Sequence, residues 1–572
     1  RHPKLVLCDL AREANPGWFQ GPDQVGYVCY TDLFANTLAG VAGRVDYLSE
    51  LGVSYLHLMP LLRAREGAND GGYAVVSYDE VEPRLGTMDD LAALANELHE
   101  RHMNLCIDFV VNHTAAEHPW AQQARAGNPE YRDFYLFYPD RVLPDGYEAT
   151  LLQVFPTFAP GNFTWLADRE EWVWSTFHDY QWDLNWANPQ VFEAMFAAML
   201  HLAQQGVDML RLDAAPFMWK RMGTLCQNLP EVHTLLTTLR ALMSVAAPAT
   251  FFKAEAIVAP EELTPYLGAG EPTRHECDLA YNNQLMVMLW SSLATGDAEL
   301  MTNALRRMGE IPSHAAWVNY VRCHDDIGWA ITAADAASVG WDQFAHRDFL
   351  LEFYSGKFAD SFATGAVFQY NPETHDGRTS GSAASLCGID RALADGDLVH
   401  LDVACARLEL LYSVIYSYGG IPLIYMGDEL GVRNDTSYLA DPAKADDNRW
   451  MHRPRMDWAV ADRRHMAGTL EARLFALFAS LATDRAAIGA LNGSGRFAVL
   501  ASPDPHVLCV TRSHPAHGRF TMVANFGHGT AVVRLAEVGA DGAAVARAAG
   551  ATVSPEGIAQ LAANGYLWLT TT

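Results

Sequence analysis

The chain has 572 residues, half of them hydrophobic, and carries 40 lysines and arginines against 68 aspartates and glutamates, a formal net charge of -28. A surface of this sign repels phosphate backbones and anionic lipid headgroups, which disfavours nucleic acid and membranes as partners. The length allows two to four domains, or one large barrel with additions.

The cysteines, the apolar runs and the first residue of the chain bear on the cellular location of the protein. The nine cysteines are scattered, odd in number and free of CxxC pairs, which disfavours a disulfide framework and favours the reducing cytoplasm. No run of 18 or more apolar residues predicts a transmembrane helix, and no signal peptide is recognisable. The chain begins at Arg1 rather than methionine, so we expect residues upstream of it.

Short apolar strands alternate with amphipathic helices over the first two-thirds of the chain. The sequence predicts strands at 25–33, 53–61, 104–113, 207–215, 250–258, 277–282, 316–326 and 421–430. It predicts helices at 36–52, 87–103, 189–206, 231–247, 403–419 and about 470–487. Eight strands separated by helices predict an α/β fold, a closed (β/α)8 TIM barrel.

The predicted barrel is interrupted twice and followed by a different pattern. It comprises residues 21–112, 188–326 and 399–491, with an aromatic-rich insertion at 113–187 after the third strand and another at 327–398 after the seventh. Loops that long are uncommon unless functional, so we expect two inserted subdomains. Short β-like runs within 492–572 predict a C-terminal antiparallel β-sandwich.

Polar residues end four of the predicted strands, at the barrel face where such enzymes carry their active sites. They are Asp108, Asn112 and His113; Arg211 and Asp213; Glu255; and His324, Asp325 and Asp326. Any one of them alone is better explained as a cap, an ion-pair partner or a core residue. The set on successive strands predicts a catalytic site.

Two of these strand ends fit acid and nucleophile chemistry. Arg211 and Asp213 share a face of one strand, and an adjacent guanidinium favours an ionised aspartate, as a nucleophile requires. Glu255 follows two phenylalanines, an apolar setting that favours a protonated acid. Two carboxyl groups with divergent pKa values, about 5–5.5 Å apart, perform retaining glycoside hydrolysis.

Four stretches, "DFVVNH", "GVDMLRLDA", "KAEAIV" and "VNYVRCHDD", resemble in order the four motifs of the alpha-amylase superfamily, glycoside hydrolase family 13. The stretches "NDGGYAVVSY", "TFHDYQWDLNWANP" and "DDNRWMHRPR" resemble its sucrose-acting branch, the amylosucrases and bacterial sucrose hydrolases. The resemblance runs from about residue 20 to 572. It implies that residues 1–20 are a remnant of the branch's N-terminal helical domain.

The resemblance implies roles for individual residues. Asp213 is the implied nucleophile, Glu255 the general acid/base, and Asp325 the third carboxylate, which holds glucose hydroxyls. Implied substrate contacts are His113, Arg211 and His324 around the glucosyl unit, Tyr73 and Phe177 packed on its ring, Asp70 and Arg449 as a salt bridge at the pocket floor, and Asp326 and Arg378 at the fructosyl unit. No cofactor and no metal site are expected.

One departure from the branch bears on the acceptor of the glucosyl group. Leu152 stands where amylosucrases carry an arginine beside the acceptor path. Leucine donates no hydrogen bond to a glucan, so we favour hydrolysis of sucrose to glucose and fructose. The alternatives are amylosucrase activity, a maltose- or trehalose-directed enzyme of the superfamily, and a non-catalytic sugar-binding or transporter-associated subunit.

Overall fold

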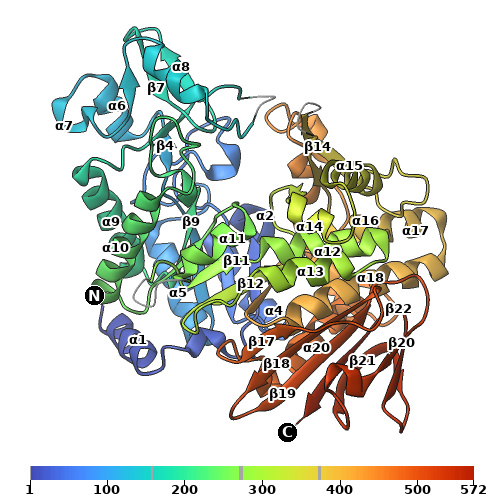
Figure 1. The fold of residues 1–572 in the computed structure, drawn as a ribbon. Coiled ribbons are helices and arrows are strands. Elements are labelled where there is room, and N and C mark those ends of the chain that lie inside the picture. Colours follow the sequence, from blue (N-terminus) through green and yellow to red (C-terminus); the bar gives the residue numbers. More distant parts are fainter. Residues whose placement is uncertain (1, 156–158, 270–274, 372–374, 572) are drawn as a thin grey trace. The chain divides into compact units, whose positions relative to one another are not determined.

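The computed structural model describes residues 2–155, 159–269, 275–371 and 375–571 (Figure 1). Eight strands pair in the order β1-β16-β12-β11-β10-β9-β3-β2, which closes into a barrel. They are β1 (Gly26–Cys29), β2 (Tyr55–Leu58), β3 (Asn104–Val110), β9 (Met209–Asp213), β10 (Phe251–Ala254), β11 (Leu279–Tyr281), β12 (Ala316–Tyr320) and β16 (Ile421–Tyr425). Each lies within its predicted range, so the predicted (β/α)8 barrel is confirmed.

The predicted helices form, one of them in two pieces. The segment expected at 36–52 divides at Gly43 into α3 (Leu38–Ala42) and α4 (Val45–Glu50). The others are α5 (Met88–Glu100), α9 (Pro189–Gln204), α10 (Pro230–Ala246), α18 (Leu398–Ser417) and α20 (Leu470–Ala486). Their starts follow from capping: Thr87 and Asp90 form a reciprocal capping box on α5.

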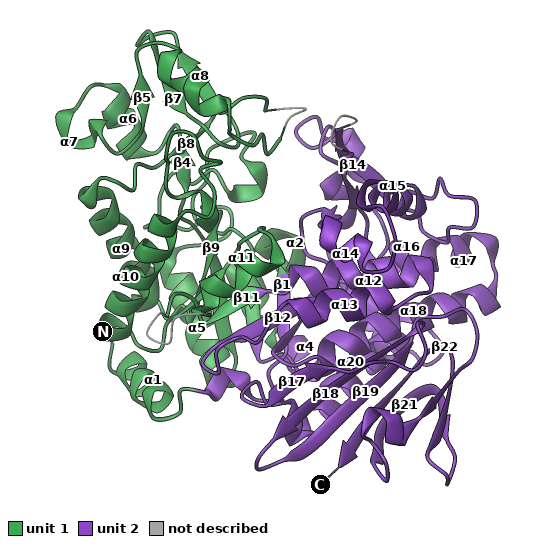
Figure 2. Ribbon diagram, in the orientation of Figure 1, with its two compact units in different colours: residues 1–16, 29–45, 56–280 green, residues 17–28, 46–55, 281–572 purple. Residues whose placement is uncertain are grey.

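The chain divides into two compact units, residues 1–16, 29–45 and 56–280 in the first and 17–28, 46–55 and 281–572 in the second (Figure 2). The finer predicted division into barrel, insertions and C-terminal part stays a prediction. Among the described residues, no helix combines the length and the hydropathy needed to cross a membrane.

In the first unit, the aromatic-rich segment forms two small antiparallel sheets. β4 (His113–Ala115) pairs with β8 (Gln181–Asp183), and β7 (Glu171–Trp174) lies between β5 (Phe137–Tyr138) and β6 (Phe163–Leu166). Trp174 and Trp182 are each 1% exposed, so these rings pack the interior of the segment. These buried aromatic residues therefore serve packing.

In the second unit, the segment 327–398 is more regular than its sequence suggested. It holds α14 (Ala333–Ala337), α15 (Gln343–Tyr354), α16 (Ala383–Cys387), α17 (Ile389–Asp395) and the sheet β13 (Ile327–Gly328), β15 (Asp376–Ser380), β14 (Ala366–Asn371). Two further helices that the sequence did not predict are α12 (Asn283–Thr295) and α13 (Glu299–Arg307). Residues 284–294 of α12 are all buried, so this helix lacks the polar face that reveals a helical period.

The C-terminal strands form one six-stranded antiparallel sheet in the order β17-β18-β19-β22-β20, with β21 also paired to β22 (red in Figure 1). The strands are β17 (Arg496–Val499), β18 (Val507–His514), β19 (Gly518–Asn525), β20 (Ala531–Arg534), β21 (Ala544–Val553) and β22 (Ile558–Thr571). The antiparallel character is confirmed. The strands form one continuous sheet because β22 is long. One edge of β22 pairs with β21, and its other edge pairs first with β20 and then with β19.

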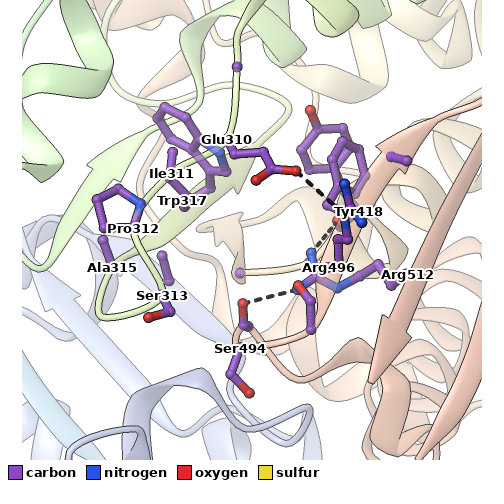
Figure 3. Close-up of a pocket in the computed structure, with 18 of the residues that line it drawn as sticks. Glu310, Ile311, Pro312, Ser313, Ala315, Trp317, Tyr418, Ser494, Arg496 and Arg512 are labelled. Atoms are coloured by element: carbon purple, nitrogen blue, oxygen red, sulfur yellow. Dashed lines mark hydrogen bonds and ion pairs between the residues drawn. The ribbon is translucent and has the colours of Figure 1, made fainter. Parts of the chain in front are cut away.

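A pocket of about 550 Å³ in the second unit lies beside the starts of β12 and β16 and the hairpin β17–β18 (Figure 3). Glu310 and Arg496 form an exposed ion pair there, with 3.5 Å between Oε1 and Nε. The buried Arg512 donates to the main-chain oxygens of Tyr418, Asn492, Gly493 and Gly495. Arg512 therefore ties the turn before β17 to the turn before β16.

The turn before β16 requires a glycine. Gly420 has φ +83, and a Cβ there would lie 2.2 Å from the Trp317 carbonyl oxygen. We expect Gly420→Ala to lower the melting temperature far more than Gly542→Ala, because Gly542 has φ +67 but no atom within 4 Å of its Cβ position. In the control, Gly542→Ala, the only cost is that of alanine in a left-handed backbone conformation, about 1–2 kcal/mol. Gly420→Ala must in addition displace the neighbouring backbone. Equal shifts in thermal unfolding would mean that the close approach to Trp317 adds no cost.

Candidate active site

In the first unit, Arg211 joins carboxylates from two strands. Its Nη1 lies 2.6 Å from Asp213 Oδ1 and also donates to Asp108 Oδ1. Arg211 and Asp213 share a face of β9, and Asp108 stands opposite Arg211 in the parallel register of β3. The sequence-predicted contact of Arg211 with Asp213 is therefore present.

Glu255 follows β10 and lies against the same group. Its Oε2 accepts a hydrogen bond of 2.9 Å from the Ala214 amide, and its Oε1 lies 4.0 Å from Arg211 Nη2. Ala214 has φ +53, a left-handed conformation that is uncommon for alanine. This turn directs the amide after Asp213 toward Glu255, so one guanidinium and one amide link the two predicted catalytic carboxyls.

Burial dominates the electrostatics of Asp213. Desolvation raises the pKa of Asp213 well above its usual value, Arg211 opposes this rise, and the nearby Glu255 and Asp108 add to it. The sequence predicted that the adjacent Arg211 favours an ionised Asp213. Arg211 does favour the charged carboxylate, but burial and the neighbouring acids outweigh it.

His113, Tyr73 and Phe177 lie together in the first unit. His113 is 1% exposed, and its Nε2 lies 3.2 Å from the Tyr73 carbonyl oxygen. Its ring lies 5.1 Å from the Phe177 ring, and burial lowers the pKa of His113 to about 4. His113 is therefore neutral at neutral pH. Asp70 Oδ1 lies 3.9 Å from Nε2 of His178, a residue that was not among the predicted contacts.

In the second unit, the adjacent acids Asp325 and Asp326 face different cations. Asp325 Oδ1 lies 3.5 Å from Arg449 Nη1 and 3.8 Å from Arg453 Nη2. Asp326 Oδ2 lies 3.8 Å from Arg378 Nε, and burial is the main cause of the raised pKa of Asp326. Neighbouring carboxylates repel, and separate guanidinium groups relieve that repulsion.

Several supporting residues of this cluster were missed by sequence reasoning. Arg453 Nε and His452 Nε2 both contact the His324 carbonyl oxygen, at 2.7 and 2.9 Å. Asp447 holds Arg449 with Nε–Oδ1 at 2.9 Å and Nη2–Oδ2 at 2.8 Å. The run "DDNRWMHRPR" contains these residues, and its density of arginines beside aspartates was the available signal.

One group among the described residues has metal-ligand composition, namely Cys323, His324 and Asp325, with one donor atom of each within 4.8 Å of the others. Asp325 already faces Arg449 and Arg453. Two guanidinium groups beside the carboxylate repel a cation, so the arrangement fits binding of polar groups of a substrate better than a metal ion.

The predicted site residues thus gather in two clusters. Asp213, Glu255 and Arg211 are linked in the first unit, as are His113, Tyr73 and Phe177. His324, Asp325 and Arg449 are linked in the second unit, and Asp326 faces Arg378 there. A joint site of the three carboxylates, and the Asp70–Arg449 salt bridge, stay predictions.

Comparisons with known proteins place the chain in a family. The model of the alpha-amylase catalytic domain matches residues 19–335. Trehalose synthase of Thermus thermophilus is 32% identical over 403 residues, which cover 70% of this chain and 37% of that protein. Glucosylglycerate phosphorylase of Escherichia coli is 26% identical over 382 residues, covering 67% of this chain and 63% of that protein. The chain spans less than two thirds of the length of either relative.

Solved structures share the fold at low sequence identity. Trehalulose synthase from Pseudomonas mesoacidophila has a TM-score of 0.69 and 18% identity, covering 97% of this chain and 99% of that one. Sucrose 6F-phosphate phosphorylase from Thermoanaerobacter thermosaccharolyticum has a TM-score of 0.69 and 17% identity, covering 88% and 93%. The family expected from the four motifs is confirmed, whereas these relatives do not single out its sucrose-acting branch. The chain belongs to the alpha-amylase family.

Proposed function

We propose that the protein is a retaining glycosidase that cleaves sucrose to glucose and fructose. The observation that carries the proposal concerns Asp326, the second acid of the stretch "VNYVRCHDD". Asp326 lies beside Arg378, whereas the neighbouring Asp325 lies beside Arg449. An enzyme that binds a glucosyl unit alone has a use for Asp325. An enzyme whose leaving group is a second sugar rich in hydroxyls also has a use for Asp326.

The proposed reaction uses the linked carboxyls in two steps. Asp213 attacks the anomeric carbon of the glucosyl unit while the bond to the fructosyl oxygen breaks, and Glu255 donates its proton to that oxygen. Ionised Glu255 then takes a proton from water, whose oxygen displaces Asp213 and releases glucose. Arg211 lies nearer to Asp213 than to Glu255, at 2.6 against 4.0 Å, which favours the negative charge on the nucleophile.

Water is the proposed acceptor because of Leu152. Its side chain is 49% exposed, and it offers no hydrogen bond to an incoming sugar. The trehalose synthase relatives support a second candidate, in which the covalent glucosyl group passes to a retained sugar rather than to water. The presence of both Asp213 and Glu255 argues against a non-catalytic sugar-binding or transporter-associated role.

The proposal is tested by incubating the purified protein with sucrose in phosphate-free buffer. We expect equal amounts of glucose and fructose and no iodine-staining polymer. Fructose in excess with polymer would indicate an amylosucrase, and glucose 1-phosphate formed on adding phosphate would indicate a phosphorylase. Absence of fructose, with turnover of maltose or trehalose in parallel reactions, would overturn sucrose as the substrate.

The role of Leu152 is tested by Leu152→Arg, with the similarly exposed Leu143→Arg as the matched control. A guanidinium at position 152 offers hydrogen bonds to a sugar acceptor. We expect the variant to shift products from free glucose toward oligosaccharides by several-fold when maltooligosaccharide is present, and the control to leave the ratio unchanged. An unaltered product spectrum in Leu152→Arg would mean that this residue does not select water as the acceptor.

The raised pKa of Asp213 predicts the acid limb of the pH profile. Asp213 must be ionised to attack, so kcat/KM should fall as the pH drops through a value above the ordinary aspartate pKa of about 4. Arg211→Met removes the cation that lowers this pKa, so its limb should move to still higher pH. Arg125→Met, which removes an ion pair with Asp168, is the control and should leave the limb in place. A wild-type limb at or below about 4 would contradict the assignment.

A further inference from the structure

A buried lysine lies beneath the predicted nucleophile. Lys253 stands on β10, two residues before Glu255, and is fully buried. Its Nζ lies 3.1 Å from Nδ1 of His57, which is also fully buried and stands on β2. On the other side of the ring, His57 Nε2 lies 2.8 Å from Asp108 Oδ2. Neither Lys253 nor His57 can touch a substrate, because both have no exposed surface.

The two contacts of His57 fix its tautomer. An ammonium group only donates hydrogen bonds, so Nδ1 of His57 must accept. The ring proton therefore lies on Nε2 and is donated to Asp108. Burial, followed by the charge of Lys253, lowers the pKa of His57 to about 4, so the ring is neutral at neutral pH. Without Lys253, the ring could instead place its proton on Nδ1 and present a lone pair to Asp108.

The chain of contacts continues to the nucleophile. Asp108 uses its second oxygen, Oδ1, for Arg211 Nη1, and the Tyr73 hydroxyl donates to that oxygen at 3.3 Å. The same Arg211 Nη1 lies 2.6 Å from Asp213 Oδ1. The orientation of Asp108 thus determines where the guanidinium stands relative to Asp213.

The charges of this buried cluster balance only with Lys253 included. When Asp108 and Asp213 are both ionised, the two positive charges of Lys253 and Arg211 balance their two negative charges. Burying an ammonium costs several kcal/mol unless opposite charge compensates it. A neutral residue at 253 would leave the cluster with excess negative charge, which opposes ionisation of Asp213.

We propose that Lys253 and His57 are positioning residues: the Lys253 ammonium holds His57 in the Nε2–H tautomer, and the pair orients Asp108 and, through it, Arg211 against Asp213. This inference rests on the proposed function in taking Asp213 as the nucleophile. It does not depend on sucrose being the substrate. The pair acts on formation of the glucosyl-enzyme and not on leaving-group protonation.

The inference is tested by single-turnover kinetics with α-glucosyl fluoride, whose leaving group needs little protonation. We expect Lys253→Met to slow formation of the glucosyl-enzyme by about 10–100-fold, as loss of a supporting hydrogen-bond partner does at metal sites, with KM changed little. His57→Gln should retain most of the rate, because its amide can donate to Asp108 from the Nε2 position. In His57→Asn, the side-chain amide takes the position of Nδ1 rather than Nε2, so we expect the rate of glucosyl-enzyme formation to fall as far as in Lys253→Met.

The pH profile gives a second readout. The groups that face Lys253 are His57 from β2, Cys106 and Asp108 from β3, and Arg211 from β9. Burial lowers the pKa of Lys253 to about 8, so the ammonium is present below that pH and is lost above it. We expect the wild-type rate to fall as pH rises through about 8, and Lys253→Met to show no such limb.

The outcomes separate the two proposals. Turnover of α-glucosyl fluoride without cleavage of sucrose would remove the substrate proposal and leave this one standing. A lower melting temperature with an unchanged rate of glucosyl-enzyme formation in these variants would assign Lys253 and His57 a structural role and overturn the positioning role. If Lys253→Met does not fold, the contrast between His57→Gln and His57→Asn decides. Nitrogen-15 NMR of wild-type His57 reads the tautomer without any activity, and a proton on Nδ1 would overturn the inference.

Discussion

The arrangement of the first unit's carboxyls depends on one buried guanidinium. Arg211 is 3% exposed, and a charge so far from water is stable only when opposite charges and hydrogen-bond acceptors surround it. The barrel meets this requirement from three neighbouring strands: Asp108 from β3, Asp213 from β9 itself, and Glu255 just after β10. The need to pair Arg211 therefore also brings the proposed nucleophile and the proposed acid/base into one place.

In the second unit, the charges that need compensation are negative rather than positive. There the acids Asp325 and Asp326 are adjacent, and guanidinium groups from distant parts of the chain compensate them. Asp447 in turn holds Arg449 in a bidentate geometry, which limits how far that cation can move. Asp213 and Asp325 thus each face a guanidinium that a further carboxylate contacts, Asp108 at Arg211 and Asp447 at Arg449.

The sequence predicted the barrel because its eight strands are short apolar runs separated by long helices. It overestimated strand length where polar motifs follow: β12 ends at Tyr320, and Asp325 and Asp326 lie beyond it, where their side chains face arginines. It missed α12, which is buried on every side, and β21, whose run "AVARAAGATV" is alanine-rich. Amphipathic periodicity carries no signal in either case.

The site could be predicted only where a motif marked it. The ends of four strands carried a visible set of acids, and the structure links Asp213 with Glu255 and Asp325 with Arg449. Lys253 and His57 were invisible, because each is one polar residue inside an apolar strand, and only the barrel's closure brings β2, β3 and β10 close enough for contact. A lone buried histidine is more often a core residue than a functional one, so spacing alone cannot distinguish the two.

The buried network also explains how one scaffold can serve enzymes with different products. The named relatives are synthases and phosphorylases. Retaining enzymes that form a covalent glucosyl-enzyme share the first half of the reaction, whatever their product. Lys253 and His57 have no exposed surface, so under the proposed mechanism they act equally whichever molecule attacks second. Under the proposed function, the residues that change the product are exposed ones such as Leu152, which offers hydrocarbon and no hydrogen bond. The proposed hydrolysis needs position 152 only to leave water access, and an exposed leucine there offers a competing sugar acceptor no hydrogen bond.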